Sequence, residues 1–124
     1  MKLAVTAKGP ELDSEVDPRF GRAMYIIVVD EESLDFEAVD NSANANAFKG
    51  AGIQAATMIS GKGAEVLLTG YCGPKAFQVL VAADIRVASD VSGTVREAVA
   101  AHRKGLLPYT DSASLDALKS FLND

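Results

Sequence analysis

The chain has 124 residues, which is enough for one domain with a buried core but short for two. Hydrophobic residues make up 48% and charged residues 23%, so a wholly disordered chain is excluded. The net charge of -5 argues against a general nucleic-acid binder, because such proteins need clustered Lys and Arg to neutralise phosphates.

Neither a membrane span nor a disulfide is expected. No apolar run approaches the roughly 18 residues that indicate a membrane span, and the chain passes from Met1 and Lys2 directly into a strand-like segment. The single cysteine cannot form an intrachain disulfide. We therefore expect a cytoplasmic protein.

The first third of the chain predicts three strands. Residues 2–7, KLAVTA, form a buried segment, and residues 24–30, MYIIVVD, form a second one. In residues 34–40, LDFEAVD, apolar and acidic residues alternate, which predicts a half-exposed strand in an antiparallel hairpin with its predecessor. The Gly- and Pro-containing loop 8–23 is long, and loops of this length are often functional.

An irregular stretch, 41–52, precedes the first predicted helix, 53–60, where Ile53 shares a helical stripe with Ala56 and Ile59. Either glycine of the following GKG should end this helix in a left-handed cap: Gly61 or Gly63. The next segment, EVLLT, is a continuous apolar run typical of a strand buried on both faces.

Two further helices and one strand are expected after that. Pro74 suits the first position of a helix, because its missing N–H would be unpaired there. Residues 85–89, IRVAS, predict a fifth strand. Thr94 and Glu97 have the spacing of a capping box at the start of a helix. The tail carries a candidate short helix with leucines at helical spacing.

The resulting order is β-β-β-α-β-α-β-α, a single α/β domain with a five-stranded mixed sheet flanked by helices. Right-handed crossovers would make the first, fourth and fifth strands parallel and leave the hairpin on one side. Ligands of such sheets bind outside the carboxyl ends of the parallel strands. Here those ends lead into the loops 8–22, 70–74 and 89–94.

Cys72 lies in LLTGYCGPKAF, at the start of a predicted helix. A thiol there tends to have a lowered pKa, which favours the thiolate. A phosphatase-type loop needs an arginine six residues after the cysteine, where this chain has Gln78. A catalytic thiol, a reactive but noncatalytic thiol and a single metal ligand remain as alternatives.

Other metal ligands are few. With one Cys and one His, the chain cannot build a four-cysteine iron–sulfur or zinc site by itself. His102 is expected to border the core near the end of its helix. Asp13, Glu15 and Asp17 alternate in the first loop, which suits either a hard cation or, more often, a solvated acidic loop.

The glycine turn favours anion binding. Gly70, Gly73 and Pro74 leave backbone N–H groups exposed at a helix start, which is a common anion site, although such glycines also serve merely as tight turns. Three cationic residues are expected nearby: Arg19, Arg22 and Lys75.

Several segments resemble one known family in the same order along the chain: VDPRFGRAMYIIVVD, GAGIQAATMI, VLLTGYCGPKAFQVLVAADIRV and SGTVREAV. They are similar to the dinitrogenase iron–molybdenum cofactor biosynthesis family, over a domain of residues 1–107 followed by a tail, 108–124. The resemblance implies a ribonuclease H-like core without nuclease activity, since strand 2–7 lacks an acidic residue for the metals. Small stand-alone members include a protein of sulfate reducers that binds a molybdenum–copper sulfide cluster without covalent attachment.

The resemblance also implies a cofactor-binding site. The family's motifs fall on these residues: Arg19, Phe20, Gly21, Arg22, Gly50, Gly52, Gly70, Gly73 and Pro74. Some members have His at the position of Arg19, so imidazole ligation is not implied here, whereas Arg suits an anionic cluster. Cys72 would add at most one thiolate ligand to the metal.

We therefore expect a non-enzymatic protein that binds or carries an anionic metal–sulfur cluster, containing molybdenum, iron or copper, or an iron–molybdenum cofactor precursor. Two alternatives remain. One is a small regulatory or partner-binding module that acts with a P-loop ATPase. The other is a thiol-dependent enzyme that uses Cys72.

Overall fold

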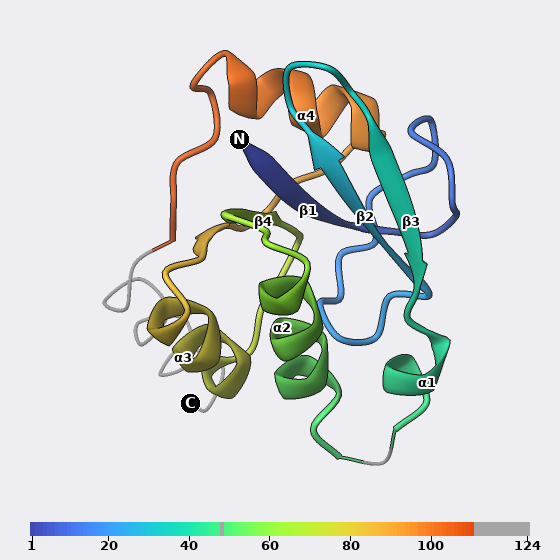
Figure 1. Cartoon of the computed structure of the whole chain (residues 1–124), viewed down its shortest axis with the longest axis vertical. Helices are drawn as coiled ribbons and strands as arrows, with labels where there is room; N and C mark the ends of the chain where they lie inside the picture. The colour runs from blue at the N-terminus through green and yellow to red at the C-terminus, as the bar shows by residue number, and fades with distance from the viewer. Residues whose placement is uncertain (48, 111–124) are drawn as a thin grey trace.

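The computed structural model describes residues 1–47 and 49–110 of the chain (Figure 1). The candidate tail helix lies outside the described residues. The elements follow in the order β1 (Lys2–Ala7), β2 (Tyr25–Asp30), β3 (Phe36–Asp40), α1 (Ser42–Ala45), α2 (Ala51–Gly61), β4 (Val66–Leu68), α3 (Pro74–Ala82), β5 (Arg86–Ala88) and α4 (Val95–Arg103).

The five strands form one mixed sheet in the order β3-β2-β1-β4-β5. β1 pairs antiparallel with β2, and β2 pairs antiparallel with β3, so the predicted hairpin is present. β4 lies parallel to both β1 and β5. The predicted α/β class, with β1, β4 and β5 parallel and a hairpin on one side, is confirmed.

Helices cover both faces of this sheet because strand residues alternate between them. On one face, Ala4, Ile26 and Leu67 belong to the same hydrophobic cluster as residues of α2 and α3. On the other face, strand residues cluster with α4 and with Leu12 and Val16 of the loop after β1. Figure 1 shows α2 and α3 side by side on one side of the sheet and α4 apart from them.

The helix ends follow their local sequence signals. Thr94 Oγ1 accepts a hydrogen bond of 3.1 Å from the Glu97 N–H, and Glu97 Oε1 accepts one of 2.9 Å from the Thr94 N–H, which is the predicted capping box. Pro74 begins α3. Gly63 has φ +80° just after α2, so it is the glycine that provides the left-handed turn. No helix of the described part is long and apolar enough to cross a membrane.

Two details differ from the sequence prediction. The stretch 41–52, expected to be irregular, contains the short helix α1, which buries no residue and so has no apolar stripe to reveal it. The third strand begins at Phe36 instead of Leu34, because Leu34 lies in the preceding turn with φ +64°. Phe36 itself is exposed, since β3 is the outer strand of the sheet.

Candidate functional site

A pocket of about 850 Å³ opens where the loop after β1 meets the first turns of α2 and α3. Its lining residues are Arg19, Phe20, Arg22, Lys49, Gly50, Ala51, Gly52, Ile53, Tyr71, Gly73, Pro74, Lys75 and Ala76. The loops 8–22 and 70–74 therefore meet as the sheet topology predicts. Loop 89–94 does not line the pocket. It contacts the neighbouring loop 70–74, where the Asp90 N–H donates to the Gly70 carbonyl at 2.8 Å.

Most of the residues predicted for the site line this pocket. They are Arg19, Phe20, Arg22, Gly50, Gly52, Gly73 and Pro74. Gly21, Gly70 and Cys72 do not line it. Gly21 and Gly70 instead allow chain segments to approach each other closely around it, and Cys72 faces the core.

The two close approaches leave no space for a side chain. A Cβ on Gly21, which has φ +91°, would lie 2.7 Å from the Gly52 nitrogen at the start of α2. A Cβ on Gly70 would lie 2.5 Å from the Pro18 Cα. Distances this short require a backbone shift, so both glycines are needed to bring the walls of the pocket together.

Backbone hydrogen bonds join the two loops across this contact. The Tyr71 N–H donates to the Pro18 carbonyl at 2.7 Å, and the Phe20 N–H donates to the Tyr71 carbonyl at 3.1 Å. Together they make a short parallel bridge between Arg19 and Tyr71. The position of Arg19 is thus tied to the loop that begins α3.

Two helices begin at the pocket without a side-chain cap. Gly50 precedes α2 with φ +75°, and Gly73 precedes α3 in an extended conformation. Among the described residues, no side chain accepts a cap hydrogen bond at either helix start, and neither first turn contains an acid. Figure 1 shows both helices starting at the same, lower end of the molecule. Their first N–H groups and dipoles favour negative charge there.

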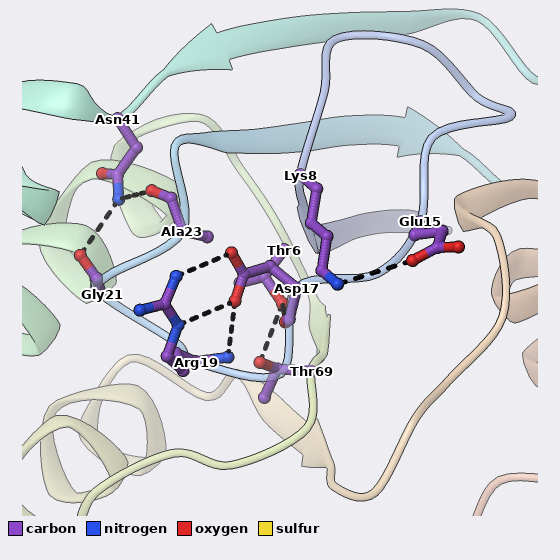
Figure 2. A network of polar contacts seen from close by, with 9 residues as sticks. All are labelled: Thr6, Lys8, Glu15, Asp17, Arg19, Gly21, Ala23, Asn41 and Thr69. Carbon is purple, nitrogen blue, oxygen red and sulfur yellow. Dashed lines mark hydrogen bonds and ion pairs between the residues drawn. The ribbon is translucent and has the colours of Figure 1, made fainter.

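Arg19 is held by a buried carboxylate (Figure 2). The Asp17 side chain is 4% exposed, whereas that of Arg19 is 67% exposed. Asp17 Oδ1 accepts hydrogen bonds from the Arg19 backbone N–H at 3.0 Å and from its Nε–H at 3.3 Å, and Oδ2 accepts one from Nη2 at 3.4 Å. The guanidinium therefore reaches the pocket while it remains attached to the loop.

Arg22 has a structural role that the sequence did not reveal. Its Nη1 donates to the carbonyls of Ala45 at 2.9 Å and Ala47 at 2.7 Å. These carbonyls lie at the end of α1 and in the connection to α2. Arg22 thus both lines the pocket and fixes the segment that carries Lys49 into it.

Cys72 is buried in the hydrophobic cluster beneath α2 and α3. Burial raises the pKa of its thiol to about 12, so the expected lowering of this pKa is wrong. The helix start favours a thiolate, but loss of hydration in the core outweighs it. A neutral, enclosed thiol disfavours the reading of Cys72 as a nucleophile.

The acidic residues of the first loop do not gather around a cation. Arg96 Nε lies 2.9 Å from Asp13 Oδ1, and Lys8 Nζ lies 3.5 Å from Glu15 Oε2, both at exposed positions. No group of three or more His, Cys, Asp or Glu in the described residues is arranged to hold a metal ion. The hard-cation reading of this loop therefore has no geometric support.

His102 lies at the edge of the core, as expected. Its Nδ1 is 2.7 Å from Glu31 Oε2, and its Nε2 is 2.9 Å from the Tyr109 hydroxyl. The histidine thus joins the last turn of α4 to two loops and does not line the pocket.

Sequence reasoning missed several pocket residues, most of them apolar. Tyr71 is 41% exposed and Ile53 is 39% exposed, and both line the pocket together with Ala51 and Ala76. Ile53 was expected on the core stripe of its helix. The signal that was available is position, because Tyr71 adjoins Gly70, and Ala51 and Ile53 adjoin Gly52.

The chain is similar to one described family and to several solved structures. The model of the family described as dinitrogenase iron-molybdenum cofactor matches residues 1–105. The apo form of the orange protein from Desulfovibrio gigas is 52% identical, and the alignment covers 88% of this chain and 92% of that one, with a TM-score of 0.85. No curated protein shows a significant match to this chain.

Two more distant structures have the same fold. A candidate NifB protein of the DUF35 family from Thermotoga is 36% identical, with 90% of this chain and 97% of that one aligned and a TM-score of 0.74. A candidate dinitrogenase from Methanocaldococcus jannaschii is 11% identical, with 90% and 95% aligned and a TM-score of 0.66. At that identity the likeness shows the fold alone.

Proposed function

Because the chain belongs to the dinitrogenase iron-molybdenum cofactor family, we propose that its pocket binds an anionic metal–sulfur cluster or an iron–molybdenum cofactor precursor. The protein acts as a carrier and not as an enzyme. One observation carries this proposal, namely that two uncapped helix starts and several cationic side chains meet in a single pocket.

The charges at the pocket are of one sign. Arg19, Arg22, Lys49 and Lys75 all line it, and none of its described lining residues is acidic. In a chain of net charge -5, this concentration of cations contrasts with the surface as a whole. Their positive potential and that of the two helix starts add, which suits a ligand with more than one negative charge.

The donor set favours contact with the outer atoms of a ligand over bonds to its metal. None of the described lining residues is Cys, His, Asp or Glu, the usual protein ligands of transition metals. Arg, Lys and backbone N–H groups instead donate hydrogen bonds to sulfido or oxo groups. A cluster whose metals already have all their ligands fits such a site.

The apolar part of the lining favours sulfido over oxo groups. Phe20, Ile53, Tyr71 and Pro74 provide carbon surface beside the cations. A weakly hydrated sulfide loses less on moving from water to such a surface than a strongly hydrated oxo group does. The volume of about 850 Å³ also lies within the range of roughly 300–1,000 Å³ for small-ligand sites, so a polynuclear cluster can enter.

The proposal also covers the detailed fold of the core, the location of the protein in the cell and its protein partner. We propose a ribonuclease H-like core, supported by the central antiparallel pairing of β1 and β2 with β4 and β5 added in parallel. β1 contains no acidic residue, so this core offers no nuclease site on its first strand. A cytoplasmic location and a P-loop ATPase partner stay predictions.

Anaerobic reconstitution tests the function directly. Apo protein is mixed with tetrathiomolybdate and copper(I), separated from free ions by gel filtration, and analysed for visible absorption, metal and sulfide. We expect stoichiometric uptake by the wild-type chain and reduced uptake by a variant with Arg19→Ala and Lys75→Ala. The matched control carries Lys8→Ala and Arg96→Ala, which remove two cations outside the pocket. Failure of the wild type to retain metal, or equal uptake by both variants, would contradict the proposal.

A further inference from the structure

We propose that Asp17 is a positioning residue for the anion site, because its buried carboxylate holds the Arg19 guanidinium side-on and directs the remaining end of that group away from the loop. The inference rests on the proposed function to the extent that the ligand is an anion. It goes beyond that function by assigning a role to an acid that does not line the pocket.

Asp17 is fixed to the sheet by its own backbone. Its N–H donates to the Thr6 carbonyl at 2.9 Å, and its carbonyl accepts a hydrogen bond of 2.6 Å from Thr6 Oγ1. Thr6 Oγ1 in turn lies 2.9 Å from Thr69 Oγ1, so the ends of β1 and β4 are joined beneath Asp17. Figure 2 shows this network beside Arg19, on the side where its guanidinium meets Asp17. The carboxylate therefore has little freedom to move.

The contact with Arg19 uses one side of the guanidinium. Nε and Nη2 approach the two carboxylate oxygens, while Nη1 has no hydrogen-bond partner among the described residues. In Figure 2, the third guanidinium nitrogen points away from Asp17. The distances of 3.3 and 3.4 Å are long for such a pair, and Arg19 is mostly exposed, so the contact orients the side chain more than it stabilises the fold.

This orientation matters because an exposed arginine has many rotamers. An anion that binds a free arginine must also immobilise it, whereas an arginine already held in place costs less to order. Asp17 also has an opposing effect, because its negative charge lowers the potential at the pocket. The two effects predict opposite changes when the charge is removed, and this difference makes the proposal testable.

A double-mutant cycle separates the two effects. Asp17→Asn keeps an oxygen for the Arg19 backbone N–H but removes the charge, and Arg19→Ala removes the guanidinium. Binding of tetrathiomolybdate is measured by equilibrium dialysis at fixed ionic strength. We expect Asp17→Asn to weaken binding about 3–10-fold in the wild-type background, as coupled neighbours do, and not to weaken it in the Arg19→Ala background.

Other results of the cycle overturn the proposal. Tighter binding in both backgrounds would show that Asp17 acts only through its charge. Equal weakening in both would show a structural role that does not pass through Arg19. The matched control is Glu15→Gln, which removes a carboxylate from the same loop, paired with Lys8, and should leave the affinity unchanged.

Two further measurements test the positioning role. One uses a second variant of Arg19, and the other is made on the protein without ligand. Lysine keeps the charge but cannot form the side-on pair, so Arg19→Lys should bind tetrathiomolybdate nearly as weakly as Arg19→Ala, and wild-type affinity would overturn the proposal. In the ligand-free protein, the NMR signal of the Arg19 Nε–H should be protected from exchange, unlike in Asp17→Ala, which removes the oxygen that accepts this N–H. An unchanged signal in Asp17→Ala overturns the positioning role even if the wild type binds no thiomolybdate, which would count against the proposed function alone.

Discussion

Gly70 lies so close to Pro18 that a Cβ on Gly70 would stand 2.5 Å from the Pro18 Cα and 2.7 Å from its carbonyl oxygen. This approach lets the Tyr71 N–H reach that same carbonyl at 2.7 Å. The contact joins the loop that carries Arg19 to the loop that begins α3. The pocket therefore depends on a backbone contact that lies outside its own lining.

We expect Gly70→Ala to destabilise the protein by about 2 kcal/mol or more, because the added methyl group forces two backbone segments apart. Urea unfolding measures this change. The comparison variant is Gly73→Ala, since Gly73 has φ -65° and nothing lies within 4 Å of its added Cβ. Similar stabilities for the two variants would show that the approach of Gly70 to Pro18 is not a structural requirement.

Cys72 should behave as an enclosed, neutral thiol. Burial raises its pKa to about 12, so the thiolate is scarce at neutral pH and its alkylation by iodoacetamide should be slow there. The rate should continue to rise with pH well beyond pH 9, whereas the unfolded chain should level off above its ordinary thiol pKa, about 8.5. Rates measured from pH 7 to 10 with and without urea test this expectation, and a plateau near pH 7 in the folded protein would refute it.

Cys72→Ala should bind tetrathiomolybdate as tightly as the wild type, because the thiol does not line the pocket. Equilibrium dialysis gives the affinities, and a thermal unfolding curve shows whether the variant remains folded at the temperature used. A clear loss of affinity in a folded variant would restore Cys72 as a ligand of the metal.

Local signals in the sequence predicted the parts of the fold that local chemistry determines. The buried apolar segments of β1 and β2, the proline at the start of α3 and the box of Thr94 with Glu97 each act over a few residues. The direction of the Cys72 side chain depends on how α3 packs against the sheet, and that packing is not written in the neighbouring residues. The position of a thiol at a helix start was therefore a poor guide to its pKa.

The candidate site was predictable to the extent that glycines and arginines mark it. Glycines are informative because close backbone approach and positive φ exclude most other residues, as at Gly21. Tyr71 and Ile53 were missed because an apolar residue at a helix start has the same appearance whether it faces the core or a pocket. The bonds between Asp17 and Thr6 and those of Arg22 to the carbonyls of Ala45 and Ala47 join segments that are remote in sequence. They use backbone groups, which leave no trace in side-chain patterns.

Lys75 should contribute to anion affinity through its charge. It lines the pocket at the first turn of α3, so Lys75→Gln should weaken tetrathiomolybdate binding about threefold at low salt, and the difference should shrink above roughly 0.5 M salt through screening. Dialysis at several salt concentrations measures both effects. Lys8→Gln is the control, because Lys8 is exposed and pairs with Glu15. An equal loss in Lys8→Gln would indicate a response to net charge and not to the pocket.

Arg22 is expected to order the connection between α1 and α2. Removing its side chain in Arg22→Ala leaves the carbonyls of Ala45 and Ala47 without the hydrogen bonds from Nη1. The amides of Ala45, Asn46 and Ala47 donate within this same segment and should then exchange with solvent faster. Amide hydrogen exchange followed by NMR or mass spectrometry measures the change.

The control for this prediction is Arg19→Ala, which removes the other arginine of the loop but no bond to α1. Only Arg22→Ala should accelerate exchange in residues 45–47, while both variants should weaken tetrathiomolybdate binding. Because Arg22 both lines the pocket and fixes α1, a bound anion that competes for its guanidinium should also change exchange in this segment. Unchanged exchange in Arg22→Ala would show that α1 is held by Asn41, whose Nδ2 donates to the carbonyls of Gly21 and Ala23, and not by the arginine.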